Sequence, residues 1–177
     1  EDSPEAGAAD IDAIGFNARD LLVGIAASGR TPYVIGAIER ARSLDAKTAC
    51  IVCAPDSPIA ARVDIPIEVI PGPEVITGST RLKAGTATKL VLNMISSGTM
   101  VRLGYVYSNL MVNVQPKNEK LVDRAQRIIM AIAQVDRQQA AKALELAGRD
   151  VRVAVVVARL GVDPGTARQR LAACGGR

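Results

Sequence analysis

Hydrophobic and polar residues alternate along the first half of the chain in blocks that predict strands and helices in turn. The first block, residues 20–27, is almost wholly apolar, which is typical of a parallel strand that is buried on both faces. The triplet Pro71-Gly72-Pro73 ends the last strand of this half. The sequence therefore predicts an α/β fold with a strand at 20–27, a helix at 32–44, a strand at 47–54, a short helix or turn at 55–62 and a strand at 65–70.

The second half of the chain changes to continuous helical patterns. A long helix is expected at 79–103, followed by an irregular or extended stretch at 104–116. The pair Asp163-Pro164 is a clear helix start, because Asp caps a helix and Pro suits its first turn. We expect a sheet domain at 1–117 and a small helical domain at 118–177. The helices of the second domain are expected at 119–135, 137–147, 151–160 and 164–173.

The apolar strand at 20–27 conflicts with so small a parallel sheet. Such a strand normally lies deep in a sheet, with a neighbour on each side. A sheet of only three strands would leave it as a hydrophobic edge, which promotes association. Either a partner chain covers this strand, or the complete sheet has strands that these 177 residues do not contain.

Composition narrows the chemistry that the chain can perform. The absence of His excludes His-based acid–base catalysis, Ser-His-Asp triads and His-containing zinc sites. The 22 Lys and Arg residues are scattered and aromatic residues make up only 2%, so nucleic acid is not an expected partner. No apolar run is long enough to cross a membrane and no signal peptide opens the chain, so we expect a cytoplasmic protein.

The spacing Cys50-x-x-Cys53 invites a redox or zinc interpretation. The two residues lie in an expected strand, where side chains three positions apart point to opposite faces, so the thiols should diverge. Zinc would need a fourth ligand, and neither His nor a second Cys pair exists. We therefore expect two buried structural thiols and no metal site.

Two hydroxyl-rich loops that precede helices are the main candidates for chemistry. The first contains Ser28, Gly29, Arg30 and Thr31, at the carboxyl end of the strand at 20–27. Its Gly allows close backbone approach, and the helix that follows favours an anion at its start. This is also where open α/β sheets bind ligands. A plain strand-to-helix turn with a capping hydroxyl explains the same residues equally well.

The second loop places Ser79 and Thr80 before the long helix and Arg81 and Lys83 in its first turn. Cations at a helix start oppose the helix dipole, and an anionic ligand would relieve that conflict. A capping hydroxyl with solvated cations is the simpler alternative. Together the two loops favour a phosphorylated small molecule as the ligand.

Both loops carry motifs of a known family. The segments Gly24-Ile-Ala-Ala-Ser-Gly-Arg-Thr-Pro-Tyr-Val34 and Thr77-Gly-Ser-Thr-Arg-Leu-Lys-Ala-Gly-Thr86 resemble the N-acetylmuramic acid 6-phosphate etherases, and so do Asn109-Leu-Met-Val112 and Asn118-Glu-Lys-Leu121. The resemblance runs over essentially the whole chain. It implies the sugar isomerase (SIS) fold, a flavodoxin-like parallel sheet flanked by helices, here partial and followed by a small ubiquitin-associated-like helical bundle. The family is longer at the N-terminus, with an earlier Gly-Thr-Ser-Gly-Arg loop and two more strands.

The resemblance also implies a reaction. The family cleaves the lactyl ether of N-acetylmuramic acid 6-phosphate to N-acetylglucosamine 6-phosphate and D-lactate in peptidoglycan recycling, without a metal or organic cofactor. A carboxylate removes the C2 proton of the open-chain aldehyde, lactate leaves from C3, and water then adds. The expected partners are a phosphorylated amino sugar and a second copy of the chain in a homodimer.

The family uses two catalytic glutamates. Glu1 matches the second glutamate of its Glu-Gly-Ala-Glu-Asp motif, whereas the Ser-Glu-Cys-Pro-Pro motif that holds the other is absent. The resemblance makes Glu74 a further acid or a ligand of a sugar hydroxyl. Phosphate binding carries over to Ser28, Gly29 and Thr31 with Arg30 beside them, and to Ser79, Thr80 and Lys83.

The chain departs from the usual family pattern at four further positions. Gly is usual where this chain has Asp45 and Ser108, Lys is common at Tyr105, and Asp at Asn113. The last three cluster just after the long helix and could loosen or retune that segment.

Three interpretations of function follow. The leading one is a lyase of the etherase family that is inactive as this 177-residue fragment. The alternative is a non-catalytic sugar-phosphate-binding regulator, like the glucokinase regulatory protein, which shares these loops. A third interpretation treats the helical tail as an interaction module, although such a bundle more often packs on its own domain or on a dimer mate.

Overall fold

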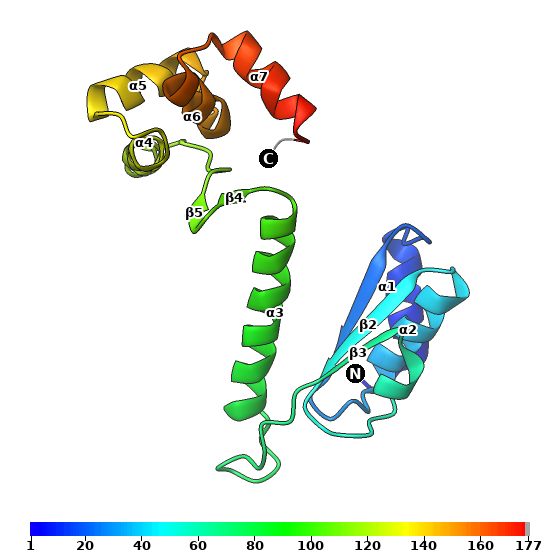
Figure 1. The fold of residues 1–177 in the computed structure, drawn as a ribbon. Helices are drawn as coiled ribbons and strands as arrows, with labels where there is room; N and C mark the ends of the chain where they lie inside the picture. The colour runs from blue at the N-terminus through cyan, green and yellow to red at the C-terminus, as the bar shows by residue number, and fades with distance from the viewer. Residues whose placement is uncertain (176–177) are drawn as a thin grey trace. The chain divides into compact units, whose positions relative to one another are not determined.

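The computed structural model describes residues 1–175, which form two compact units that divide between Ile95 and Ser96 (Figure 1). The division lies within the long helix α3 (Lys83–Arg102), which the sequence pattern places at 79–103. The expected domain boundary between residues 117 and 118 stays a prediction. We describe each unit by itself.

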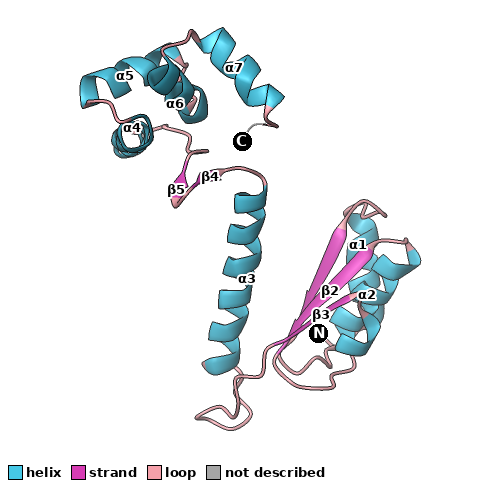
Figure 2. Ribbon diagram, in the orientation of Figure 1, coloured by secondary structure: helices cyan, strands magenta, loops and turns pink. Residues whose placement is uncertain are grey.

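The first unit is a parallel sheet with helices, as the sequence pattern predicts. Its three strands run in the order β1-β2-β3, and both pairings are parallel, so the arrows in Figure 2 point the same way. Its elements are α1 (Pro4–Ala13), β1 (Leu21–Ile25), α2 (Pro32–Ser43), β2 (Lys47–Val52), the 3-10 turn η1 (Ala60–Arg62) and β3 (Ile65–Glu68).

The prediction that the first strand is buried on both faces is wrong. Strand β1 lies at the edge of the sheet, and Leu21 and Ile25 remain 54% and 43% exposed. Gly24 points to the opposite face, where a Cβ would lie 2.8 Å from side-chain atoms of Val34 and Ile38 of α2. The hydrophobic edge that the sequence analysis anticipates is therefore present, because β2 takes the central position.

Helix α1 is an element that the sequence analysis missed. Its start signal is local: the Ser3 hydroxyl accepts a hydrogen bond from the Ala6 amide at 3.1 Å, and Pro4 occupies the first turn. Two polar contacts join the helix to α2. The Tyr33 hydroxyl donates to Asp10 at 2.6 Å, and Arg40 pairs with Asp12 at 2.7 Å.

Two glycines let the backbones of α1 and α2 touch. A Cβ on Gly7 would lie 2.0 Å from the carbonyl oxygen of Tyr33, and a Cβ on Gly36 would lie 2.0 Å from that of Pro4. No side chain fits at either position without moving a helix backbone. The close crossing holds the N-terminal segment against the start of α2.

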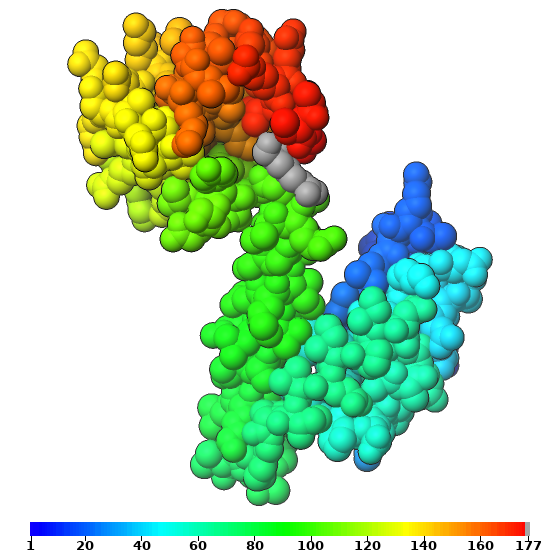
Figure 3. Space-filling model, viewed as in Figure 1, coloured from blue at the N-terminus to red at the C-terminus, as the bar shows by residue number. Residues whose placement is uncertain are grey.

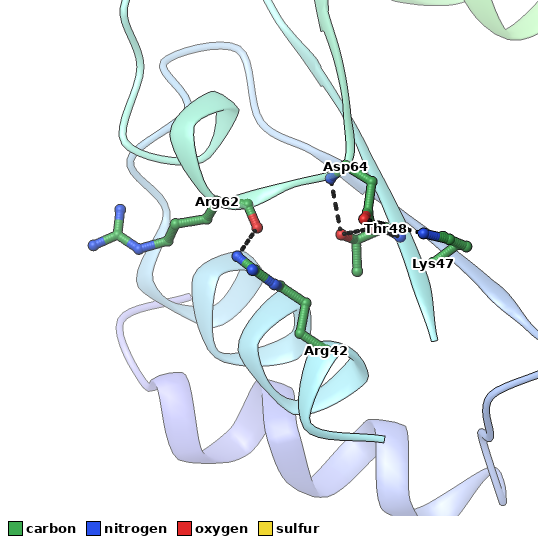
Figure 4. A network of polar contacts seen from close by, with 5 residues as sticks. All are labelled: Arg42, Lys47, Thr48, Arg62 and Asp64. Carbon is green, nitrogen blue, oxygen red and sulfur yellow. Dashed lines mark hydrogen bonds and ion pairs between the residues drawn. The ribbon is translucent and has the colours of Figure 1, made fainter. Parts of the chain in front are cut away.

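A polar network ties the start of β2 to the segment before β3 (Figure 4). Asp64 accepts hydrogen bonds from the amide and the hydroxyl of the buried Thr48, at 2.8 and 2.9 Å. These two donors, the amide first, hold the pKa of Asp64 below its ordinary value. Arg42 of α2 donates to the Arg62 carbonyl, so α2 joins the same corner.

The second unit contains the end of α3, a small hairpin and four helices. The hairpin pairs β4 (Val106–Tyr107) with β5 (Leu110–Met111) in antiparallel fashion, within the stretch expected to be irregular or extended. All four expected tail helices are confirmed, and in Figure 3 they form one continuous surface from yellow-green to red. They are α4 (Glu119–Ala133), α5 (Arg137–Leu146), α6 (Val151–Leu160) and α7 (Pro164–Ala173).

Side-chain caps start each of these helices. Asn118, Asp136, Asp150 and Asp163 all accept hydrogen bonds from backbone amides of the first turn, and Asp136 forms a capping box with Gln139. The helices enclose an aliphatic core that includes Ile129, Ala140, Val151, Ala154 and Ala167. Among the described residues no helix is long and apolar enough to cross a membrane.

Two of the departures from the family pattern fall at left-handed backbone positions. Asp45 has φ +57° after α2, and Ser108 has φ +54° in the hairpin turn. Glycine adopts this conformation without steric cost, whereas a side chain costs about 1–2 kcal/mol. A Gly at either position would therefore remove a conformational cost.

The α1–α2 crossing predicts that Gly36→Ala destabilises the first unit by about 2 kcal/mol, because the new methyl group meets the Pro4 carbonyl. Amide hydrogen exchange in the central strand β2 should become about 30-fold faster. The matched control is Gly98→Ala in α3, where the methyl meets nothing within 4 Å. The control should leave β2 unchanged and add helix propensity. Equal effects of the two variants would contradict the close crossing.

The hairpin turn predicts that Ser108→Gly raises the stability of the second unit by about 1 kcal/mol, because Gly relieves the left-handed strain. Asp45→Gly should gain less in the first unit, since Asp tolerates this conformation better than Ser. Urea unfolding followed by circular dichroism measures both changes. A loss of stability in Ser108→Gly would show that the turn is not strained.

Candidate functional site

The first candidate loop lies at the carboxyl end of β1 and is fixed to the segment that follows β2. The Cys53 amide donates to the Ala27 carbonyl at 2.9 Å, and the Ile59 amide donates to the Gly29 carbonyl at 3.1 Å. Gly29 has φ +62°, and a Cβ there would lie 2.4 Å from the side chain of the buried Ser57. Gly29 is therefore required both by its conformation and by the lack of space.

This loop presents a set of hydrogen-bond donors that the fold does not use. Among the described residues, no acceptor pairs with the backbone amides of Ser28, Arg30 or Thr31, nor with their side chains. Thr31 is the N-cap residue of α2, yet its hydroxyl makes no capping bond. Ser28 and Arg30 are exposed and Thr31 is half-buried. Three amides, two hydroxyls and a guanidinium on one short loop suit an anion with several oxygens.

The start of α2 itself is partly occupied. Pro32 has no amide hydrogen, and the Tyr33 amide donates to the carbonyl oxygen of Glu1 at 3.1 Å. The helix therefore offers an anion its dipole, while the donors come from the loop before it. The same bond places Glu1 beside the loop, and the N-terminus lies near the start of α2 (Figure 1). The Glu1 side chain is exposed.

The second candidate loop is organised around Glu74. One carboxylate oxygen accepts from the Lys83 amide at 3.0 Å, and the other accepts from the Ala84 amide at 3.0 Å. These two bonds hold the pKa of Glu74 below its ordinary value, so the group stays ionised and caps α3. A tightly held carboxylate with a lowered pKa is poorly suited to donate a proton.

Ser79, Thr80 and Lys83 lie around this cap. The Ser79 amide closes a turn onto the Ile76 carbonyl at 3.1 Å, and Ser79 is half-buried while Thr80 and Lys83 are exposed. Neither hydroxyl caps α3, because Glu74 does so. No hydrogen bond joins this loop to the Ser28–Thr31 loop within residues 1–175. Because β1 and β3 are parallel, both loops leave the same edge of the sheet.

The expectation of two buried thiols in a strand holds for Cys50 of β2 and is wrong for Cys53, which follows the strand and is half-buried. Cys50 is fully buried, and burial raises the pKa of its thiol. Cys53 is half-buried on the other face, with its sulfur 3.8 Å from the Ala84 carbonyl and 3.9 Å from the Thr88 hydroxyl of α3. Both thiols are free. Among residues 1–175, no group of three or more Cys, Asp or Glu side chains is arranged to hold a metal ion.

The sequence analysis missed three features of this site. It did not foresee the unpaired loop amides, the carbonyl of Glu1 on α2, or Glu74 as a cap. The contact of the Glu1 carbonyl with α2 had a sequence signal in two glycines. Gly7 lies four residues after Ser3, and Gly36 lies four residues after Pro32. Only the folded loops show the other two.

Comparison with known proteins places the chain in a family. Residues 9–97 match the SIS domain. The chain belongs to the SIS domain family. An N-acetylmuramic acid 6-phosphate etherase of Serratia proteamaculans is 54% identical over 171 residues, or 97% of this chain, and one of Rubrobacter xylanophilus is 53% identical over 173 residues, or 98%. This chain covers 58% of the length of each of these relatives.

A solved structure supports the same family. A Bacteroides fragilis protein, assigned as a phosphosugar isomerase involved in capsule formation, is 27% identical with a TM-score of 0.51. The match covers 60% of this chain and 56% of that protein. The predicted α/β fold of the SIS type is thereby confirmed.

The Glu74 cap predicts a pH dependence. Because the pKa is lowered in the folded state, the cap contributes stability at neutral pH and loses it as the pH falls through the lowered pKa. The NMR signals of the Lys83 and Ala84 amides should therefore titrate with a midpoint below the ordinary pKa of a glutamate. In Glu74→Gln this titration should vanish and both amides should exchange faster.

The matched control for this titration is Glu145→Gln, which changes an exposed glutamate near the end of α5. It should leave both amide signals and their titration as in the parent chain. Amides of Lys83 and Ala84 that do not respond to pH in the parent chain would contradict the cap.

Proposed function

We propose that this chain is the sugar-phosphate-binding part of an N-acetylmuramic acid 6-phosphate etherase, a carbon–oxygen lyase of peptidoglycan recycling. The observation that carries the proposal is the Ser28–Thr31 loop, whose unpaired donors suit a phosphate, with Glu1 held at the same helix start. The relatives named as etherases support the choice of substrate. The substrate of this proposal is a phosphorylated amino sugar.

The phosphate would bind mainly through the first loop. The hydroxyls of Ser28 and Thr31 and the three loop amides donate to its oxygens, Arg30 adds a positive charge, and Gly29 lets the backbone come close. Ser79, Thr80 and Lys83 contribute from the same edge of the sheet, on the side of the sugar. Glu74 acts by holding the start of α3 in place.

Glu1 would act as the general base on the open-chain sugar. Its carboxylate takes the proton from C2, next to the C1 aldehyde, and the electron pair expels the lactyl oxygen from C3. That oxygen leaves with a proton as the hydroxyl of D-lactate, and the sugar becomes an unsaturated aldehyde. Water then adds to C3 while C2 regains a proton, which gives N-acetylglucosamine 6-phosphate.

A second group must protonate the lactyl oxygen as it leaves. Glu74 is not available for this step, because its carboxylate accepts the Lys83 and Ala84 amides at the start of α3. We therefore propose that the 177-residue chain alone is inactive. A homodimer and a cytoplasmic location belong to the same proposal. The exposed Leu21 and Ile25 favour cover by a second copy, and three free cysteines suit a reducing compartment.

The test is a chimera in which the Serratia relative supplies the residues that lie outside the match with this chain. It should release D-lactate from N-acetylmuramic acid 6-phosphate, and the 177-residue chain should not. In the chimera, Glu1→Gln should lower kcat by about 10²–10⁴-fold. Thr31→Val should raise KM about tenfold with little change in kcat, because it removes a phosphate contact.

The control variant is Glu39→Gln, an exposed glutamate of α2, which should keep normal turnover. A folded chimera that binds N-acetylglucosamine 6-phosphate but releases no D-lactate would favour the regulatory alternative. Full turnover in Glu1→Gln would show that Glu1 is not the general base. It would not contradict phosphate binding by the Ser28–Thr31 loop.

A further inference from the structure

The second unit contains a pocket that the proposed function does not use. It has a volume of about 420 Å³, which is within the range of small-molecule sites. The end of α3, the hairpin and helices α4, α6 and α7 all contribute to it. Its wall is mainly aliphatic and includes Val101, Val112, Ile132, Val155, Val156 and Leu171.

The rim of this pocket is apolar and open. Val101, Tyr107 and Leu160 line it and are 56%, 55% and 50% exposed. A concave surface of this kind gains free energy when an apolar body covers it. Sugars and nucleotides do not suit it, because their hydroxyls would be buried against valine and isoleucine without partners.

Two arginines give this pocket a positive charge. Arg152 and Arg159 lie seven residues apart on α6, and both line the pocket. The Arg152 guanidinium lies 5.9 Å from the centre of the Tyr105 ring, and Arg159 donates to the Ile132 carbonyl at 2.6 Å. Both cations are therefore held in place by neighbours that carry no charge.

Among the described residues, no carboxylate forms an ion pair with either of these two cations. Within residues 1–175, no Asp or Glu lines the pocket, and neither arginine forms a salt bridge. A fixed positive charge beside an apolar wall selects a ligand that is apolar at one end and anionic at the other. A neutral or cationic ligand would gain only the apolar part of this interaction.

We propose that this pocket binds a small amphipathic anion, with the apolar body against Val155 and Val156 and the anionic head group at Arg152, whose guanidinium stacks on Tyr105. Arg159, two turns further along α6, adds positive charge at the other end of the pocket. A medium-chain carboxylate has this chemistry. The site lies wholly in the second unit and is independent of the proposed sugar-phosphate loop.

Calorimetry and methyl NMR on the full chain test this site with decanoate below its micelle concentration. Decanoate should bind with saturation and shift the methyl signals of Val155, Val156 and Leu171. Decylamine, which has the same body and the opposite charge, and acetate, which has the charge without the body, should bind at least about tenfold more weakly. Decylamine binding as tightly as decanoate would overturn the proposal.

Three variants locate the head group. Arg152→Gln should weaken decanoate binding about tenfold, Arg159→Gln should weaken it less, and Leu160→Glu should weaken it through repulsion at the exposed rim. The control Arg124→Gln, an exposed arginine of α4 outside the pocket, should bind as the parent does. Equal binding in the two pocket arginine variants and the parent would overturn the site.

Two further outcomes would also overturn it. The first is that decanoate shifts the methyl signals of Leu90 and Leu92, which are exposed on α3, as much as those of Val155 and Val156. Decanoate would then bind exposed apolar surface in general. The second is that the methyl signals of the pocket residues change with protein concentration and do not change with decanoate. That result would assign the pocket to a second copy of the chain.

Discussion

The contact on which the rest of the first unit depends is the backbone crossing of α1 and α2 at Gly7 and Gly36. Because neither residue has a side chain, the two helices lie close enough for the carbonyl of Glu1 to reach the Tyr33 amide. The Asp10–Tyr33 and Asp12–Arg40 contacts orient the same pair of helices. The backbone of Glu1, which is remote in sequence, is thus held beside the loop at Ser28–Thr31.

Both helix starts at the carboxyl edge of the sheet are capped by oxygen atoms of the chain itself. The Glu1 carbonyl takes the Tyr33 amide of α2, and the Glu74 carboxylate takes the Lys83 and Ala84 amides of α3. These amides are therefore not free for the usual arrangement in which a phosphate binds directly at a helix N-terminus. Among the described residues, the amides, hydroxyls and arginine of the first loop keep no partner in the chain and stay available as donors.

Much of this fold could be predicted from the sequence, because strands, long helices and capped tail helices each leave a local pattern. Helix α1 was missed although Ser3-Pro4-Glu5 is a start signal, since its ten residues show little apolar periodicity. The apolar pattern of β1 predicts burial on both faces and is wrong, because burial depends on which strand takes the centre of the sheet; only the small number of strands points to an exposed edge. Glu74 looked like an acid or a sugar ligand, and only the fold of the loop brings it back to a helix start nine residues later.

The central claim is that the Ser28–Thr31 loop binds the phosphate and that Glu1 faces the sugar. A crystal structure of the chain with N-acetylglucosamine 6-phosphate tests it most directly. The account predicts phosphate oxygens within hydrogen-bond distance of the Ser28, Arg30 and Thr31 amides, with the sugar ring toward Glu1 and Glu74 still capping α3. A phosphate bound at the start of α3 in place of Glu74, with the first loop empty, would contradict the account.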